Sequence, residues 1–157
     1  GVVSLVVVFL FQSTIAWIIS WPLLTNVSSD VAISSFTDIL GILLWIIGFI
    51  FEAVGDWQMS QFTHDPRNAG KVMNQGLWRY TRHPNYFGEC CVWWGFFLLA
   101  ADAGAWWTVF SPLLMTVLLL KVSGVTLLER GLVATKPAYA DYVRRTSAFV
   151  PWFPRVR

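Results

Sequence analysis

Charged side chains are scarce in this chain of 157 residues: Asp, Glu, Lys and Arg make up 13% of it, against about 25% in ordinary soluble domains. Only two histidines and two cysteines are present, which excludes a metal site built from several histidines and a disulfide scaffold. The formal net charge of +2 gives no sign of nucleic-acid binding. The glycine-rich dinucleotide, P-loop and serine-hydrolase motifs are also missing from the sequence.

Hydrophobic residues, in contrast, make up 56% of the chain and aromatic residues 17%, with a mean hydropathy of +0.58. A soluble domain of this size cannot bury so much apolar surface, so we expect one all-α integral membrane domain, residues 1–157. Apolar stretches long enough to span a bilayer predict four transmembrane helices at about 2–24, 36–57, 84–101 and 106–128. A polar cytosolic connector (63–83) and a cytosolic tail (129–157) that includes an amphipathic helix complete the chain.

The positive charges are distributed unevenly. Lys and Arg lie in the connector, in the tail and in the half of the fourth stretch next to it, and none lies at 25–35 or 102–105. By the positive-inside rule, this asymmetry places both termini and the connector in the cytoplasm. Because residue 1 is Gly and the chain opens inside an apolar run, we expect a fragment whose natural N-terminal part is absent.

The densest group of polar side chains is in GLWRYTRHPNYFGE, residues 76–89. It lies where the third stretch begins, and free N–H groups at a helix start favour an anion. Arginine and histidine pair with phosphates, so the residues indicate an anionic-ligand site. The alternative is a basic loop that binds anionic lipid headgroups. The members of this group are Arg79, Arg82, His83, Asn85, Tyr86 and Glu89, with Lys71 just upstream.

Ionisable residues also lie within the apolar stretches: Glu52, Asp56, Glu89 and Lys121. All four fall at the expected cytoplasmic ends, which indicates one polar chamber open to the cytosol. Each has an ordinary alternative, since the carboxylates can be interfacial and a lysine can snorkel.

The tail holds a second polar group. Tyr139, Tyr142 and Arg145 are spaced by three residues and share a helical face, which could close over a ligand held by the first group. Glu129 lies where the fourth helix leaves the membrane. The alternative is an interfacial amphipathic helix with belt aromatics.

Four segments carry a resemblance to a known family: EAVGDWQMSQF (52–62), GLWRYTRHPNYFGE (76–89), KVSGVTLLE (121–129) and YADYVRRTSAFVPW (139–152). The chain resembles, over essentially its whole length, bacterial membrane proteins related to the C-terminal domain of steroid 5α-reductase. The wider superfamily includes sterol reductases and isoprenylcysteine carboxyl methyltransferases. The resemblance implies the last four helices of a bundle of about seven, in the bacterial inner membrane, with NADPH entering from the cytosol.

The resemblance also implies roles for individual residues. Lys71 and Lys121 match basic positions near the cofactor phosphates, Asn85, Glu89 and Trp93 border the nicotinamide end, and Tyr142 and Arg145 belong to the covering tail. The expected cofactor-binding residues are Lys71, Arg79, Arg82, His83, Asn85, Trp93, Lys121, Glu129, Tyr142 and Arg145, and the expected catalytic residues are Tyr86 and Glu89. In the steroid enzymes, the groups that polarise the enone lie in N-terminal helices, which we expect to be absent from this chain.

The leading hypothesis is a membrane reductase that transfers hydride from NADPH to an activated C=C of a steroid-like or other lipidic substrate. A second hypothesis is a methyltransferase of the isoprenylcysteine or phospholipid type, which would use S-adenosylmethionine. A third is a non-catalytic, lipid-binding subunit of a membrane complex. Membrane lipids are expected partners in each case, together with absent N-terminal helices or a partner subunit; no metal and no nucleic acid are expected.

Overall fold

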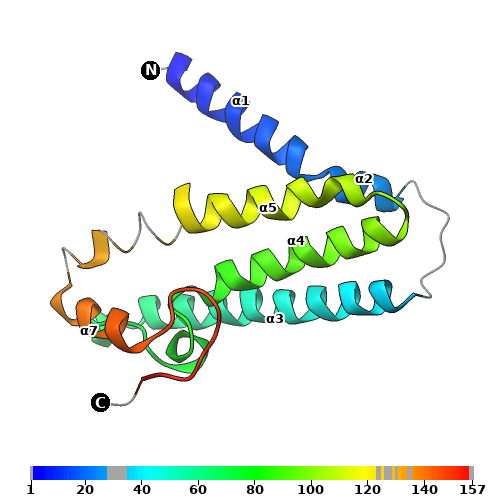
Figure 1. Cartoon of the computed structure of the whole chain (residues 1–157). Helices are drawn as coiled ribbons and strands as arrows, with labels where there is room; N and C mark the ends of the chain where they lie inside the picture. Colours follow the sequence, from blue (N-terminus) through cyan, green and yellow to red (C-terminus); the bar gives the residue numbers. More distant parts are fainter. Residues whose placement is uncertain are drawn as a thin grey trace.

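The computed structural model describes residues 2–27, 35–122, 125, 129, 131–133 and 136–155. These residues form helices joined by turns, with one isolated parallel bridge between Thr81 and Ser147 (Figure 1). The all-helical prediction is therefore confirmed for this part of the chain. The α-helices are α1 (Val2–Ile19), α2 (Trp21–Val27), α3 (Phe36–His64), α4 (Pro84–Asp102), α5 (Phe110–Val117) and α7 (Pro137–Arg145). The shorter elements are the 3-10 helices η1 (Pro66–Asn68), η2 (Gly76–Arg79) and η3 (Trp106–Val109) and the π-helix η4 (Leu118–Val122).

The longest helix, α3, has 29 residues and begins with a capping box. Ser35 Oγ accepts from the backbone N–H of Asp38 at 3.0 Å, and Asp38 Oδ2 accepts from that of Ser35 at 3.1 Å, which satisfies two N–H groups left free at a helix start. The helix ends at His64 because Pro66 disfavours a helical conformation for Asp65, whose backbone is extended. It therefore runs seven residues past the expected span, 36–57, and projects a polar last turn beyond it.

Helices α3 and α4 pack against each other in antiparallel directions (Figure 1), and glycines let their backbones approach closely. Gly41, Gly48 and Gly55 recur every seven residues on α3, opposite Gly95, Gly88 and the first turn of α4. A Cβ atom added at Gly48 would lie 2.6 Å from the carbonyl oxygen of Gly88. This pair of helices positions the start of α4 against the polar end of α3.

The first expected span, 2–24, is not one straight helix. The axes of Val6–Ile19 and Trp21–Val27 differ by 46°, and the break lies at Ser20. Pro22 has no N–H to donate and its ring clashes with the preceding turn, which accounts for the bend. The hydroxyl of Ser111 on α5 donates to the carbonyl of Ile19 and so satisfies an acceptor at the break. The stretch expected as the first span therefore consists of two helices with a bend between them.

Of the described helices, α3 alone is long and apolar enough to cross a membrane, and α1 with α2 would make a second if the bent pair is one span. The stretch Trp106–Val122 is apolar but shorter. Most of 123–128, the end of the fourth expected span, lies outside the described residues. The turn expected at 102–105 contains Gly104, whose φ of +86° favours glycine.

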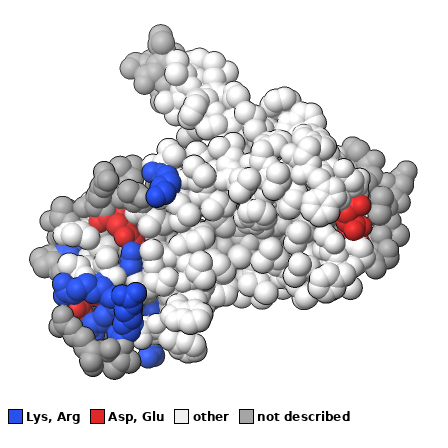
Figure 2. All heavy atoms as spheres, in the orientation of Figure 1, with Lys and Arg blue, Asp and Glu red and all other residues white. Residues whose placement is uncertain are grey.

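Lys and Arg side chains gather at one end of the molecule, as Figure 2 shows. At that end, the connector, α7 and a C-terminal arm, residues 146–155, meet the last turns of α3 (Figure 1). The arm runs beside the residues that precede α4: Arg82 N donates to Ser147 O at 2.9 Å, and Trp152 N donates to Tyr80 O at 2.9 Å. The polar residues singled out by the sequence are thus concentrated in one region of the fold.

Candidate functional site

The 3-10 helix η2 rests on the polar extension of α3. Trp78 Nε1 donates to the carbonyl of Gly55 at 3.0 Å, and the backbone N–H of Leu77 donates to Gln58 Oε1 at 3.0 Å. Tyr142 on α7 in turn donates its hydroxyl proton to the carbonyl of Trp78. These bonds stack α3, η2 and α7 in three layers and fix the floor of the site.

A buried ion-pair cluster joins the start of α4 to the tail. Arg82 Nε donates to Glu129 Oε1 at 2.7 Å and Arg82 Nη2 to Oε2 at 3.0 Å, so the pair is bidentate. His83 Nε2 lies 2.9 Å from the same Oε1. Arg82 Nη1 also donates to the carbonyls of Val143, at 3.0 Å, and Thr146. The side chains of Arg82 and His83 are 7% and 2% exposed, which places this cluster in the interior.

The ionisation of Glu129 follows from these contacts. Burial alone would raise the pKa of its carboxyl, but the hydrogen bonds and charges of His83 and Arg82 outweigh burial and hold that pKa below its ordinary value. The carboxylate is therefore ionised at neutral pH. Because the Arg82 guanidinium is engaged by this carboxylate and by two carbonyls, Arg82 positions α7 and the arm.

Two tyrosines of α7 form the roof of the site. Tyr139 and Tyr142 are buried, with ring centroids 5.6 Å apart. Burial raises the pKa of Tyr139 to about 12 and also raises the pKa of Tyr142. Both phenols are therefore neutral at physiological pH, and that of Tyr142 donates to the carbonyl of Trp78.

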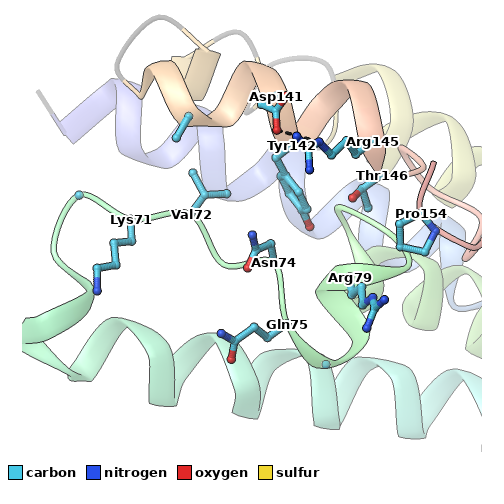
Figure 3. Close-up of a pocket in the computed structure, with 13 residues that line it drawn as sticks. Lys71, Val72, Asn74, Gln75, Arg79, Asp141, Tyr142, Arg145, Thr146 and Pro154 are labelled. Atoms are coloured by element: carbon cyan, nitrogen blue, oxygen red, sulfur yellow. Dashed lines mark ion pairs between the residues drawn. The ribbon is translucent and has the colours of Figure 1, made fainter. Parts of the chain in front are cut away.

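Between this roof and the connector lies a cavity of about 770 Å³ (Figure 3). Lys71 from the connector, Arg79 from η2 and Arg145 from α7 contribute positive charge to its lining. Among the described lining residues Asp141 alone is acidic, and its Oδ2 lies 2.8 Å from Arg145 Nε. The remaining lining residues are Gly70, Val72, Asn74, Gln75, Gly76, Ala138, Tyr142, Thr146 and Pro154. An excess of cations with amide donors is suited to an anionic ligand.

A second cavity of about 300 Å³ shares Lys71, Val72 and Tyr142 with the first. Its lining is mostly apolar, and Arg82, His83 and Asn85 supply polar atoms at the start of α4. The other residues that line it are Met59, Phe62, Thr63, Met73, Trp78, Leu132, Lys136 and Tyr139. The two adjoining cavities thus offer a cationic part and an apolar part to one ligand, with volumes in the range of about 300–1,000 Å³ typical of ligand pockets.

The structure brings seven of the expected cofactor-binding residues to these cavities: Lys71, Arg79, Arg82, His83, Asn85, Tyr142 and Arg145. Tyr139, Tyr142 and Arg145, expected to share a helical face, all line the same region.

Five expected site residues line neither cavity. Glu129 is the ion-pair partner described above, and Lys121 lies exposed in η4. Trp93 packs its ring against Phe96 on α4 at 5.8 Å. Tyr86 and Glu89, the expected catalytic residues, lie on the first turns of α4, where the Tyr86 ring stacks on His83 at 5.3 Å.

Several lining residues were not singled out by the sequence. Asn74 and Gln75 reach the larger cavity only because the connector folds back over α3, and nothing in their local pattern marks them. Lys136 lines the smaller cavity, and its Nζ donates to the carbonyl of Lys71 at 3.1 Å. The one sequence feature that marks Lys136 is Pro137 after it, since proline is common in the first turn of a helix.

In its described residues the protein is all-helical, with at least one helix long and apolar enough to cross a membrane and a cation-lined cavity at one end. The chain belongs to a family of proteins of unknown function, DUF1295, whose family model matches residues 2–146. Comparisons with curated proteins and with solved structures gave no match.

Proposed function

We propose that this chain is an integral membrane protein with four spans, formed by α1 with α2, by α3, by α4 and by the helical stretch after Trp106. A rise of about 1.5 Å per residue makes the 19 residues of α4 about 28 Å long, close to the hydrocarbon thickness of about 30 Å. Large apolar side chains of α3 are about half exposed, which suits contact with lipid. These are Ile39, Leu40, Leu43, Ile46, Ile47, Phe49 and Ile50.

Exposed tryptophans support the placement of both membrane surfaces. Trp17, Trp106 and Trp107 are exposed near the turn that follows α4, and Trp57 and Trp152 are exposed near the cationic end. Tryptophan is enriched at both membrane surfaces. By the positive-inside rule, we propose that the cationic end, and the two cavities with it, lie on the cytoplasmic side of the inner membrane.

We further propose that the two cavities bind NADPH and that the protein is a reductase of an activated C=C in a steroid-like or other lipidic substrate. One observation carries this proposal: three cations, two from the connector and one from α7, converge on one cavity with a single carboxylate. NADPH brings several phosphate charges, whereas S-adenosylmethionine is cationic at sulfur and has no phosphate. The family resemblance of the sequence adds to the proposal.

The residues of the site have distinct roles in this proposal. Lys71, Arg79 and Arg145 hold the phosphates, and the apolar cavity with His83 and Asn85 accepts a ring system and excludes water. NADPH, when bound, supplies a hydride to the β-carbon of the activated C=C.

The groups nearest the chemistry are proposed at the start of α4. Tyr86 and Glu89 lie on its first two turns, close in sequence to His83 and Asn85, which line the apolar cavity. Groups that polarise the substrate would come from further membrane helices or a partner subunit. Lys121, Trp93 and Glu129 are retained as cofactor residues only through the resemblance, and Glu129 acts through Arg82.

The test is thermal protection of the full chain in nanodiscs by NADPH, NADH and S-adenosylmethionine, because a ligand of the folded state raises its stability. We expect protection by NADPH, with an apparent Kd about tenfold higher in Lys71→Ala and in Arg79→Ala, the low end of what a charged hydrogen bond contributes. Arg67→Ala removes an equal charge from an exposed residue outside both cavities and serves as the control. Protection by S-adenosylmethionine instead would favour the methyltransferase hypothesis, and protection by neither would favour a lipid-binding subunit.

A further inference from the structure

The C-terminal arm is fixed to the edge of the helical pair α3–α4. Thr81 Oγ1 donates to the carbonyl of Phe149 at 2.8 Å, and Arg155 N donates to the carbonyl of Arg145 at 2.9 Å. The Phe149 ring contacts Phe87 on the first turn of α4 at 5.9 Å. Phe87 in turn contacts Phe51 of α3 at 5.2 Å. The arm therefore lies at the level where the apolar parts of both helices end.

Although its backbone is fixed, the arm turns large apolar side chains outward. Val150 is 59% exposed, Trp152 70% and Phe153 75%. Three such side chains close together on an ordered segment are costly in water and call for an apolar environment. Tryptophan in this setting is typical of the interface between headgroups and hydrocarbon, where its ring is half in each.

Arginines lie directly beside these side chains. A hollow of about 390 Å³ is lined by Arg82, Arg144, Arg145 and Arg155, and also by Trp152 and Phe153. Among its described lining residues none is acidic.

The nearby carboxylates neutralise only part of this charge. Glu129 binds Arg82, and Asp141 lies 3.0 Å from Arg144 Nη2 and 2.8 Å from Arg145 Nε. Four arginines with two carboxylates leave a net charge of +2. An apolar side and a cationic side on one ordered segment match a bilayer surface with negative headgroups.

We propose that the arm is a docking surface for anionic phospholipid headgroups, in which Arg144 and Arg155 pair with headgroup phosphates while Trp152 and Phe153 insert among the acyl chains. The proposal goes beyond the reductase function and requires only that the helices lie in a bilayer. The hollow shares Arg145 and Thr146 with the cavity lined by Lys71, whereas Arg144, Trp152, Phe153 and Arg155 line the hollow alone. Docking there would hold α7, the roof of the cofactor cavities, against the membrane.

The experiment uses the full chain in phosphatidylcholine nanodiscs with and without phosphatidylglycerol. Brominated versions of each lipid quench nearby tryptophans, and subtracting the signal of Trp152→Phe isolates Trp152. We expect brominated phosphatidylglycerol to quench Trp152 several-fold more than brominated phosphatidylcholine at equal content. The preference should vanish in the double variant Arg144→Gln/Arg155→Gln and persist in Arg67→Gln, which removes a charge from an exposed residue outside the arm.

Several outcomes would overturn the proposal. Absence of quenching by either lipid would place the arm outside the bilayer and favour a protein partner. An unchanged preference in the double variant, or an equal loss in Arg67→Gln, would remove the role of these arginines. Competition by soluble glycerophosphate would identify a site for free anions. A matching loss of NADPH binding in the double variant would assign both arginines to the cofactor site. If neither the wild type nor any variant binds NADPH but the lipid preference is intact, only the proposed reductase function is contradicted.

Discussion

Replacement of Arg82 by Ala should release α7 and the C-terminal arm from the start of α4. The guanidinium makes two bonds to Glu129 and two to backbone carbonyls, and its backbone N–H donates to Ser147. Alanine keeps only the last of these. The carboxylate of Glu129 would then be left with His83 as its partner in a site where it is 16% exposed.

The size of the effect follows from burial. Removal of one partner from a buried ion pair costs about 3–5 kcal/mol. The residual exposure of Glu129 and its contact with His83 favour the lower end, while the two abandoned carbonyls of Val143 and Thr146 add to the loss. We expect about 3 kcal/mol, which corresponds to about a 100-fold change in an opening equilibrium.

Hydrogen–deuterium exchange of the protein in nanodiscs measures this opening directly. Peptides covering 137–155 should exchange about 100-fold faster in Arg82→Ala, whereas peptides from the middle of α3 should be unchanged. Arg82→Lys should recover little, because an ammonium cannot make the bidentate contact. Arg67→Ala, which breaks an exposed ion pair with Asp65, is the control. Equal exchange of the tail peptides in Arg82→Ala and in this control would refute the reasoning.

Three further predictions concern stability and binding. Gly48→Ala should lower the free energy of unfolding by about 1–3 kcal/mol, because its Cβ would overlap the Gly88 carbonyl. Gly131→Ala, whose Cβ meets nothing within 4 Å, should leave that free energy unchanged, and urea unfolding followed by circular dichroism checks both. Since the folded pKa of Glu129 lies below its unfolded value of about 4.3, its contribution is present above that pH and is lost as the pH falls through the folded pKa; acid unfolding of wild type should therefore be steeper than that of Glu129→Gln. Lys71→Ala should weaken NADPH protection while Lys121→Ala, at an exposed position lining neither cavity, should weaken it far less, as paired thermal shifts would show.

Local pattern was enough to predict part of this architecture. Pro84, with its missing N–H, marks the first turn of α4, and Gly104 marks the turn after it. The three-residue spacing of Tyr139, Tyr142 and Arg145 predicts one helical face, and all three line the cavities. These features depend on residues close in sequence, whose geometry is set by the chain itself.

Long-range pairings were outside the reach of the pattern. Arg82 and Glu129 were both singled out as ligand-binding residues, but the structure shows them bound to each other across most of the C-terminal half. A charge near a membrane edge looks the same in sequence whether it faces a ligand or a buried partner. The close approach of α3 and α4 likewise depends on glycines from two helices. The bend at Ser20 depends on Pro22 and on a hydrogen bond from the distant hydroxyl of Ser111.

Burial separates the cations of this protein by role. Arg82 is desolvated and directs four of its five N–H donors to acceptors within the chain, which leaves little for a ligand. Lys71 and Arg79 are exposed to the larger cavity, where a phosphate group can replace water as their partner without leaving a buried charge unpaired. Arg145 is exposed as well, but its Nε already donates to Asp141, so it contributes fewer donors to an anion. The affinity for an anion should therefore depend most on Lys71 and Arg79. The shape of the cavity that receives the anion should depend on Arg82.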